Sequence, residues 1–247
     1  MERRLWRLNW REFAEAVEET DTVILPIGVV EAHGPHLPLG TDFMIPQWIA
    51  ERIADELNAL IAPPISYGVV SSLLAYPGSM TVSKDSFESY VRDVLVALTQ
   101  NGLDRVIILN GHGSRDHVDA LKSACKEAWI RYGTRCLIIH WWIYGEEISR
   151  EILGSVGGHA GTEETAAIMA IDDSLVRTQD LREQIYLYRK GIEPIPAPGS
   201  ILLYDENDSV EIPSRESAER FMMEVVSRIS DEVRRVMKGW DLQEIGF

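Results

Sequence analysis

Short apolar stretches rich in branched side chains alternate with longer segments of helical periodicity along most of this chain. Apolar runs without polar alternation are typical of parallel strands that are buried on both faces of a sheet. Strands and helices in alternation predict an α/β fold, in which a mostly parallel central sheet is covered by helices on both sides. The predicted strands are residues 22–27, 60–65, 105–109 and 135–139, and the helices predicted between them are residues 45–60, 86–99 and 117–132.

The helix at 86–99 has the clearest local signals, because Asp85-Ser-Phe-Glu88 resembles a capping box and Gly102 follows the last turn. A further amphipathic helix is predicted at 214–238. The proline-rich residues 191–199 predict an ordered loop and a candidate lid. No repeat or linker divides the chain, so we expect a single domain over residues 1–247, a length that one α/β domain can reach.

The charge balance and the two cysteines limit the partners and the compartment that we expect. The chain has 39 acidic and 24 basic side chains and a formal charge of −15, so its surface would repel nucleic acid. No signal peptide or membrane-spanning apolar run is present, so no membrane association is expected. Cys125 and Cys136 match neither a redox pair nor a zinc spacing, which favours reduced thiols. These features predict a cytoplasmic protein.

Three glycine-flanked segments concentrate the residue types that bind transition metals. Imidazole and carboxylate groups on short backbone segments, with room left for a water, are what a catalytic metal site needs. Their clustering here therefore predicts a hydrolytic metal site. The segments are Glu31-Ala-His33-Gly-Pro-His36-Leu-Pro-Leu-Gly-Thr-Asp42, Asn110-Gly-His112-Gly and Gly157-Gly-His159-Ala-Gly-Thr-Glu163-Glu164-Thr.

Two of these segments follow predicted strands directly and should meet in space. In a parallel α/β sheet the ligand crevice lies outside the carboxyl ends of the strands, which brings the Glu31 and His112 segments together. Glu31 and His33 point the same way in an extended segment, and a turn at 34–35 would bring Asp42 back beneath them. A carboxylate in that position can bridge two cations.

Each motif also has a structural explanation. Glu31, His33 and Asp42 could form a polar surface loop, and His112 could cap a helix or bond a buried carbonyl group. Glu163 and Glu164 after His159 could be an ordinary acidic helix N-terminus. Structural or surface roles are expected for the three remaining histidines, and a core or pocket-wall position for two adjacent tryptophans. These residues are His36, His117, His140, Trp141 and Trp142.

The segments together resemble the creatininase (creatinine amidohydrolase) family. Its members carry, in order, Glu-x-His-Gly-x-His-Leu-Pro, Thr-Asp, Asn-Gly-His-Gly and His-Ala-Gly-x-x-Glu-Thr. These blocks are matched here at 31–38, 41–42, 110–113 and 159–165, and the segment 76–80 is similar to the family's Phe-Pro-Gly-Thr turn. The match covers roughly residues 20–170, with blocks in the same order and in strand–helix context.

The resemblance implies a three-layer α/β/α sandwich and a binuclear site with zinc and manganese. By similarity, Glu31, Asp42 and His112 would hold one ion, and His33 with the bridging Asp42 would hold the other. Creatininase itself has a glutamate ligand two residues past the second histidine, where this chain has Ser114. We expect Glu164 to supply that carboxylate.

The remaining site residues and the assembly follow from the same resemblance. We expect Ser79, Gly113 and Ser114 to bind the substrate and His159 to be the catalytic proton shuttle. The tryptophan and acidic residues that face the substrate in the family, shortly before the His159 position, are absent, which argues against creatinine itself. A homo-oligomer, possibly a hexamer, is expected.

These features lead to three functional hypotheses. The first is a metal-dependent hydrolase that opens a small cyclic amide or cleaves a formamide with an activated water. The second is a hydrolase of a carbon–carbon bond in a cyclic diketone such as a keto-inositol, because an enolate leaving group can use the same chemistry. The third is a non-catalytic metal-binding assembly protein, since a fold does not determine a function.

Overall fold

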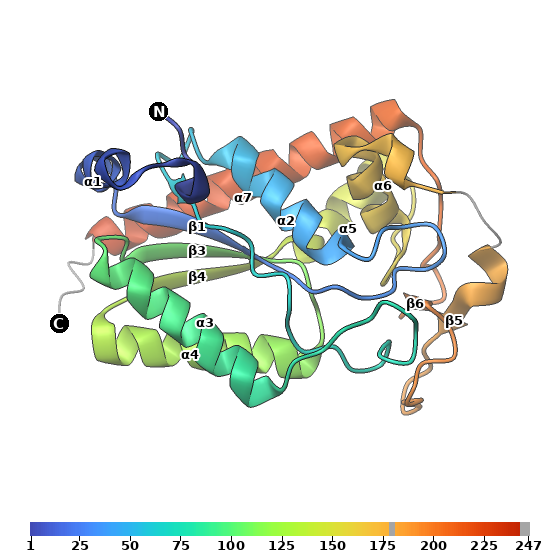
Figure 1. Ribbon diagram of the computed structural model, residues 1–247. Helices are drawn as coiled ribbons and strands as arrows, with labels where there is room; N and C mark the ends of the chain where they lie inside the picture. Colours follow the sequence, from blue (N-terminus) through green and yellow to red (C-terminus); the bar gives the residue numbers. More distant parts are fainter. Residues whose placement is uncertain (178–180, 243–247) are drawn as a thin grey trace.

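The computed structural model describes residues 1–177 and 181–242. Its central sheet confirms the prediction of a parallel α/β fold, because all pairings between its strands are parallel (Figure 1). The strand order is β2-β1-β3-β4. The strands are β1 (Thr22–Ile27), β2 (Leu60–Ile61), β3 (Arg105–Asn110) and β4 (Arg135–His140).

Helices cover both faces of this sheet, which confirms the three-layer α/β/α sandwich (Figure 1). One face packs on α3 (Lys84–Gln100) and α4 (Arg115–Tyr132), with α1 (Trp10–Glu19) at the edge of the same cluster. The four helices of the other face are α2 (Thr41–Ile53), α5 (Trp141–Ile152), α6 (Thr162–Ile171) and α7 (Arg215–Leu242).

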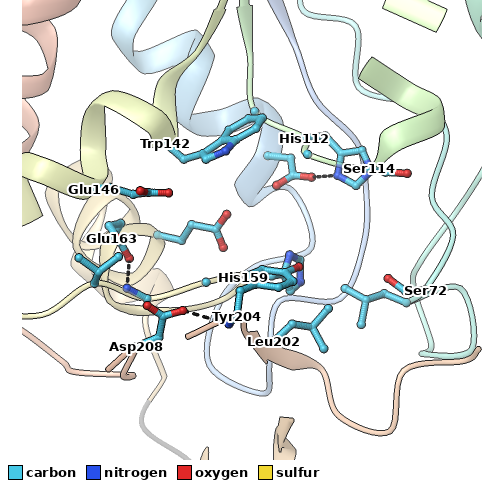
Figure 2. A pocket seen from close by; sticks show the side chains of 18 of the residues that line it. Ser72, His112, Ser114, Trp142, Glu146, His159, Glu163, Leu202, Tyr204 and Asp208 are labelled. Atoms are coloured by element: carbon cyan, nitrogen blue, oxygen red, sulfur yellow. Dashed lines mark hydrogen bonds and ion pairs between the residues drawn. The ribbon is translucent and has the colours of Figure 1, made fainter. Parts of the chain in front are cut away.

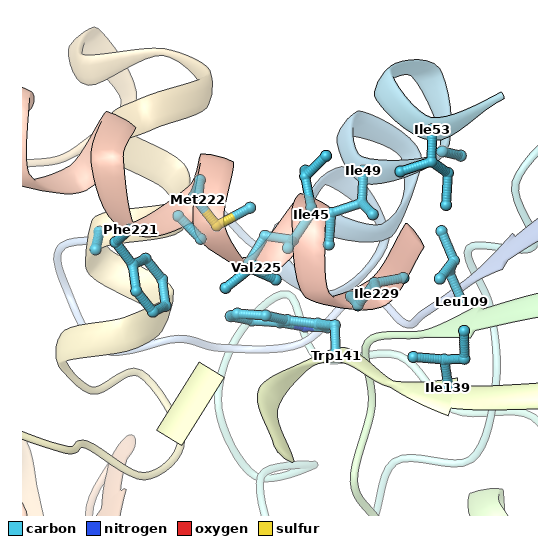
Figure 3. Close-up of a cluster of buried hydrophobic side chains, with 14 of the residues drawn as sticks. Ile45, Ile49, Ile53, Leu109, Ile139, Trp141, Phe221, Met222, Val225 and Ile229 are labelled. Carbon is cyan, nitrogen blue, oxygen red and sulfur yellow. The ribbon is translucent and has the colours of Figure 1, made fainter. Parts of the chain in front are cut away.

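The alternation of side chains along each strand separates the two cores. Ile24 and Ile107 face the α2–α7 side, whereas their neighbours Leu25 and Ile108 face α3 and α4. Since side chains on both faces of the sheet are buried in a core, the strand sequences are continuous apolar runs. Trp141 is fully buried and packs beneath α7, with residues such as Val225 and Ile229 around it (Figure 3). It is therefore a core residue.

A second, smaller parallel sheet lies beyond the main one and reaches the site (Figure 1). It pairs β5 (Ile185–Leu187) with β6 (Ile201–Leu203). The N–H of Leu202 donates to the carbonyl oxygen of His159 at 2.9 Å, which ties β6 to the segment before α6. Three short 3-10 helices complete the described elements: Leu5–Arg7, Asp173–Leu175 and Leu181–Gln184.

Several boundaries differ from those predicted. The strand predicted at 60–65 stops at Ile61, because the prolines at 63 and 64 have no N–H, and pairing resumes only as a bridge at Ile65. The helix predicted at 45–60 runs from Thr41 to Ile53 instead. Ser83, rather than Asp85, caps α3 by accepting the N–H of Ser86. The capping-box prediction was therefore wrong by two residues.

Helices α1, α5 and α6 were not predicted. Helix α5 follows β4 without an intervening loop. Helix α6 is apolar around most of its circumference, because it packs against neighbouring helices on more than one side. A helix of that kind shows no amphipathic stripe. None of the helices in the described ranges is long and apolar enough to cross a membrane.

Candidate metal centre

A cavity of about 470 Å³ opens at the carboxyl ends of β1 and β3 (Figure 2). Ile27 and Asn110, the last residues of these strands, are paired in register, so the segments that follow them emerge side by side. Glu31, Asp42 and His112 line the cavity together with His159 and Glu164 from the segment around the start of α6. The tertiary structure therefore brings the three glycine-flanked segments into one site.

The carboxylate of Asp42 lies between two histidines. Its Oδ1 is 2.9 Å from Nε2 of His33, and its Oδ2 is 2.9 Å from Nδ1 of His112. Oε1 of Glu31 is 3.0 Å from the same Nδ1 of His112. All four side chains are buried. One carboxylate thus presents each oxygen to a different imidazole, which is the arrangement of a bridging ligand.

Backbone carbonyl groups set the tautomer of both imidazoles. Nδ1 of His33 is 3.0 Å from the carbonyl oxygen of Glu31, and Nε2 of His112 is 3.1 Å from that of Val69. A carbonyl oxygen only accepts, so each of these nitrogens carries the hydrogen in the neutral ring. The opposite nitrogens then turn their lone pairs toward Asp42, as metal-ligating histidines do.

Two glycines allow Asp42 to approach the sheet. A Cβ at Gly28 or at Gly111 would overlap the backbone carbonyl group of Asp42. Gly28 directly follows β1 and Gly111 directly follows β3, so the first turn of α2 rests on both strand ends. Any larger residue would push Asp42 away from the histidines, and the two glycines are part of how the site is built.

Glu164 occupies the space beside His33. Its Oε2 is 3.7 Å from Nε2 of His33 and accepts the N–H of Ala160 at 2.6 Å. Ser114 lies elsewhere in the cavity, with its hydroxyl 3.5 Å from that of Ser71. Glu163 and Glu164 do stand in the first turn of α6, so the helix-terminus explanation holds for their position, but both side chains also line the cavity.

His159 faces the same carboxylates. Its Nε2–H donates to the carbonyl oxygen of Ala32 at 2.7 Å, and its Nδ1 is 3.7 Å from Oε1 of Glu31. Its ring centroid is 4.2 Å from that of His33. One imidazole nitrogen is therefore fixed by the backbone, while the other is directed at the cluster.

The electrostatics of the cluster favour a cation. Burial alone would lower the pKa of His33, but the carboxylates of Asp42 and Glu164 outweigh it and raise the pKa to about 10. Glu31 and Asp42 likewise raise the pKa of His112 against the effect of burial. The donor set also has the composition of a metal site. Three groups can each place their ligand atoms within 4.8 Å of one another: Glu31–Asp42–His112, His33–Asp42–Glu164 and Glu31–His33–His159.

Comparison with known proteins identifies the family. The family model described as creatininase, creatinine amidohydrolase, matches residues 6–222. The chain belongs to the creatininase family. The creatinine amidohydrolase of Pseudomonas putida is 25% identical to it over 92% of this chain and 94% of that protein. A creatininase crystal structure has the same fold, with a TM-score of 0.77, 22% identity and coverage of 95% and 97% of the two chains.

Other relatives of this chain are named for different activities. A mycofactocin precursor peptide peptidase of Mycolicibacterium smegmatis is 26% identical over 86% of this chain and 84% of that protein. A 3-dehydro-scyllo-inosose hydrolase of Thermotoga maritima is 31% identical, over 43% of this chain and 34% of that protein. Creatininase structures of this fold also include an Mn form and a Zn–Zn type. The family thus spans several substrate classes.

Two of the three residues predicted to bind substrate line the cavity, and the third does not. Gly113 and Ser114 line the cavity. Ser79 is not among the described residues that line it, and its hydroxyl instead accepts the N–H of Ala32 at 2.9 Å. Ser79 therefore supports the loop that carries Glu31 and His33. The turn motif at residues 76–80 could not by itself show that Ser79 lies outside the lining of the cavity.

The three histidines without a predicted chemical role all have structural partners, and Nδ1 of His140 accepts the side-chain N–H of Asn110 at 3.0 Å. Nε2–H of His36 donates to the hydroxyl of Thr165 at 3.0 Å, which joins the first segment to α6. His117 is buried, stacks on Phe87 and accepts the N–H of Val69 through Nδ1. These observations agree with the structural roles expected for the three residues.

Sequence reasoning missed part of the cavity wall. Glu146 of α5, Glu163 of α6 and Tyr204 after β6 line it, whereas Trp142 lies in the wall as expected for one of the two adjacent tryptophans (Figure 2). Residues 191–199 do not line the cavity within the described part of the chain. The lid prediction for that segment is therefore not supported, and Tyr204, Asp205 and Asp208 line the cavity instead. Only a prediction of α5 could have pointed to Trp142 and Glu146 together.

Proposed function

We propose that this creatininase-family chain is a metal-dependent hydrolase that cleaves the carbon–nitrogen bond of a small cyclic amide or a formamide with water. The observation that carries the proposal is the orientation of Asp42, whose two oxygens face the ligand nitrogens of His33 and His112. A carboxylate shared in this way is the central feature of a two-metal hydrolytic site.

The donor set fits two divalent ions. Glu31, Asp42 and His112 would hold one, and His33, Asp42 and Glu164 would hold the other. Nitrogen and oxygen donors of this kind suit zinc and manganese, and creatininases of this fold include Mn and Zn–Zn forms. Bound there, the ions would activate water at neutral pH and polarise the substrate carbonyl group.

Glu164→Gln should reduce the metal content from two ions per chain to one, since an amide oxygen is a weaker ligand than a carboxylate. Ser114→Ala should keep both ions, because a neutral hydroxyl is a poor ligand for zinc and the hydroxyl of Ser114 lies beside that of Ser71, at 3.5 Å. Elemental analysis of the two purified variants checks this. A loss of metal in Ser114→Ala with full content in Glu164→Gln would reassign the ligand.

The side chains around the substrate would then carry the proton. Water adds to the carbonyl carbon, the carbon–nitrogen bond breaks, and a proton moves from the water to the leaving nitrogen. His159 is placed to carry it through Nδ1, because its Nε2–H is held by Ala32. Gly113 and Ser114 would contact the substrate at the cavity wall. General acid–base transfer of this kind contributes about 10²–10⁴-fold to turnover.

A second candidate reaction is hydrolysis of a carbon–carbon bond in a cyclic diketone. The relative from Thermotoga maritima, which acts on an inosose, is the observation that favours it. The same site would serve, with the proton from His159 passing to carbon rather than to nitrogen. A non-catalytic assembly protein fits less well, because the cluster opens into a cavity with His159 directed at it. We further propose a cytoplasmic homo-oligomer, possibly a hexamer.

A substrate screen tests the reaction. The protein with its metal ions should hydrolyse at least one compound among lactams, formamides and short peptides. Chelation should abolish the activity, and zinc or manganese should restore it. Turnover of cyclic diketones alone would establish the second candidate reaction. Binding of metal ions without turnover of any class would favour the assembly protein.

A further inference from the structure

One wall of the cavity combines an aromatic ring with carboxylates that the proposed reaction does not use. Trp142, Glu146 and Arg150 are four residues apart along α5 and all line the cavity. Figure 2 shows Glu146 and Glu163 on the side away from Ser72 and Ser114, with Trp142 above them. Glu146 and Glu163 thus line the side of the cavity opposite the hydroxyl groups of Ser72 and Ser114.

Glu163 has an oxygen that lacks a partner. The residue is 4% exposed and lines the cavity, and its Oε2 accepts the N–H of Gly157 at 2.5 Å. Its Oε1 is buried and has no hydrogen-bond partner among the described residues. A buried carboxylate oxygen without a donor costs free energy, and most such oxygens in proteins have one. The wall therefore lacks an N–H donor at this position.

The other charged groups of this wall already have partners. The carboxylate of Asp208 accepts the N–H groups of Tyr204 and Asp205, and that of Asp205 accepts from Asn207. The hydrogen bonds from Asn207 lower the pKa of Asp205, and the nearby guanidinium of Arg150 adds to this effect. Glu146 is exposed in the cavity beside Glu163, so among the described residues of this wall these two side chains are available to a ligand.

The following inference rests on the amide hydrolysis proposed above. We propose that the substrate is a cationic amide, whose ammonium or guanidinium group binds between Glu146, Glu163 and Trp142. Burial raises the pKa of Glu163 to about 8, and a cation would supply both N–H donors to its free oxygen and the counter-charge that favours its carboxylate form. The half-buried indole of Trp142 adds an aromatic face that attracts cations through a cation–π interaction. The scissile amide then extends from this wall toward Asp42 and the histidines.

A matched pair of lactams tests the proposal. Ornithine lactam carries an ammonium group at neutral pH, and δ-valerolactam has the same ring without it. Calorimetric titration of the metal-containing protein should give a dissociation constant at least about tenfold lower for ornithine lactam. Glu146→Gln and Glu163→Gln should each bring the two constants to within about threefold, with δ-valerolactam unaffected.

The control is Glu147→Gln, which removes the same charge one residue further along α5. Glu147 pairs with Arg228 and does not line the cavity, so the variant should keep the full preference. Equal affinity for both lactams in the unmodified protein, or a preference that survives in both Glu146→Gln and Glu163→Gln, would overturn the proposal. Where a lactam is turned over, its Michaelis constant from the same calorimeter takes the place of the dissociation constant. Where neither lactam is turned over, the binding constants remain readable, so a failure of the hydrolase proposal would not obscure this result.

Discussion

Asp42→Ala should leave the purified protein without either metal ion. The carboxylate presents one oxygen to His33 and the other to His112, so its removal takes a ligand from both positions at once. Turnover should fall by at least about three orders of magnitude, because activation of water at neutral pH depends on the ions. Elemental analysis and the rate on the best substrate of the screen measure the two effects.

Two further variants make this result specific. Asp42→Asn keeps the shape of the side chain and should lose metal as well, which separates ligand loss from misfolding. Asp93→Ala removes an aspartate that is largely exposed on α3 and should retain two ions and full turnover. Two ions per chain in Asp42→Ala would contradict the bridged two-metal site.

His159→Asn should retain both metal ions yet lose about two to four orders of magnitude in turnover, the scale of general acid–base catalysis. The asparagine amide takes the place of Nδ1 of His159 beside Glu31, but it is too short to replace the hydrogen bond from Nε2–H to the carbonyl oxygen of Ala32. It cannot exchange a proton near neutral pH. Metal content and turnover measured on the same preparation separate binding from chemistry.

The two other outcomes assign His159 differently. Its Nδ1 forms one of the possible metal-binding groups with Glu31 and His33, so loss of an ion in His159→Asn would make it a ligand. Full metal content with unchanged turnover would leave it as a structural histidine that joins the first segment to α6.

The layers of this fold could be predicted because strand and helix differ in local pattern. Strands β1 and β3 are buried on both faces and therefore appear as apolar runs at the predicted positions, and the edge strand β4 shows the same pattern although most of its residues are only half-buried. Helix α6 has no such signature, since packing on α2, α5 and α7 buries it on several sides. Local periodicity reports how a segment faces solvent, and that information disappears when a helix is enclosed.

The sequence by itself determined the ligand types, their order along the chain and the edge of the sheet where they meet, because parallel strands end at a common edge. Only the tertiary structure decided that Glu164 lies beside His33, that Ser79 supports a loop, and that Glu146 and Glu163 share a wall with Trp142. These placements depend on how α5 and α6 pack on the sheet. Contacts between residues distant in the chain have no signature in local sequence.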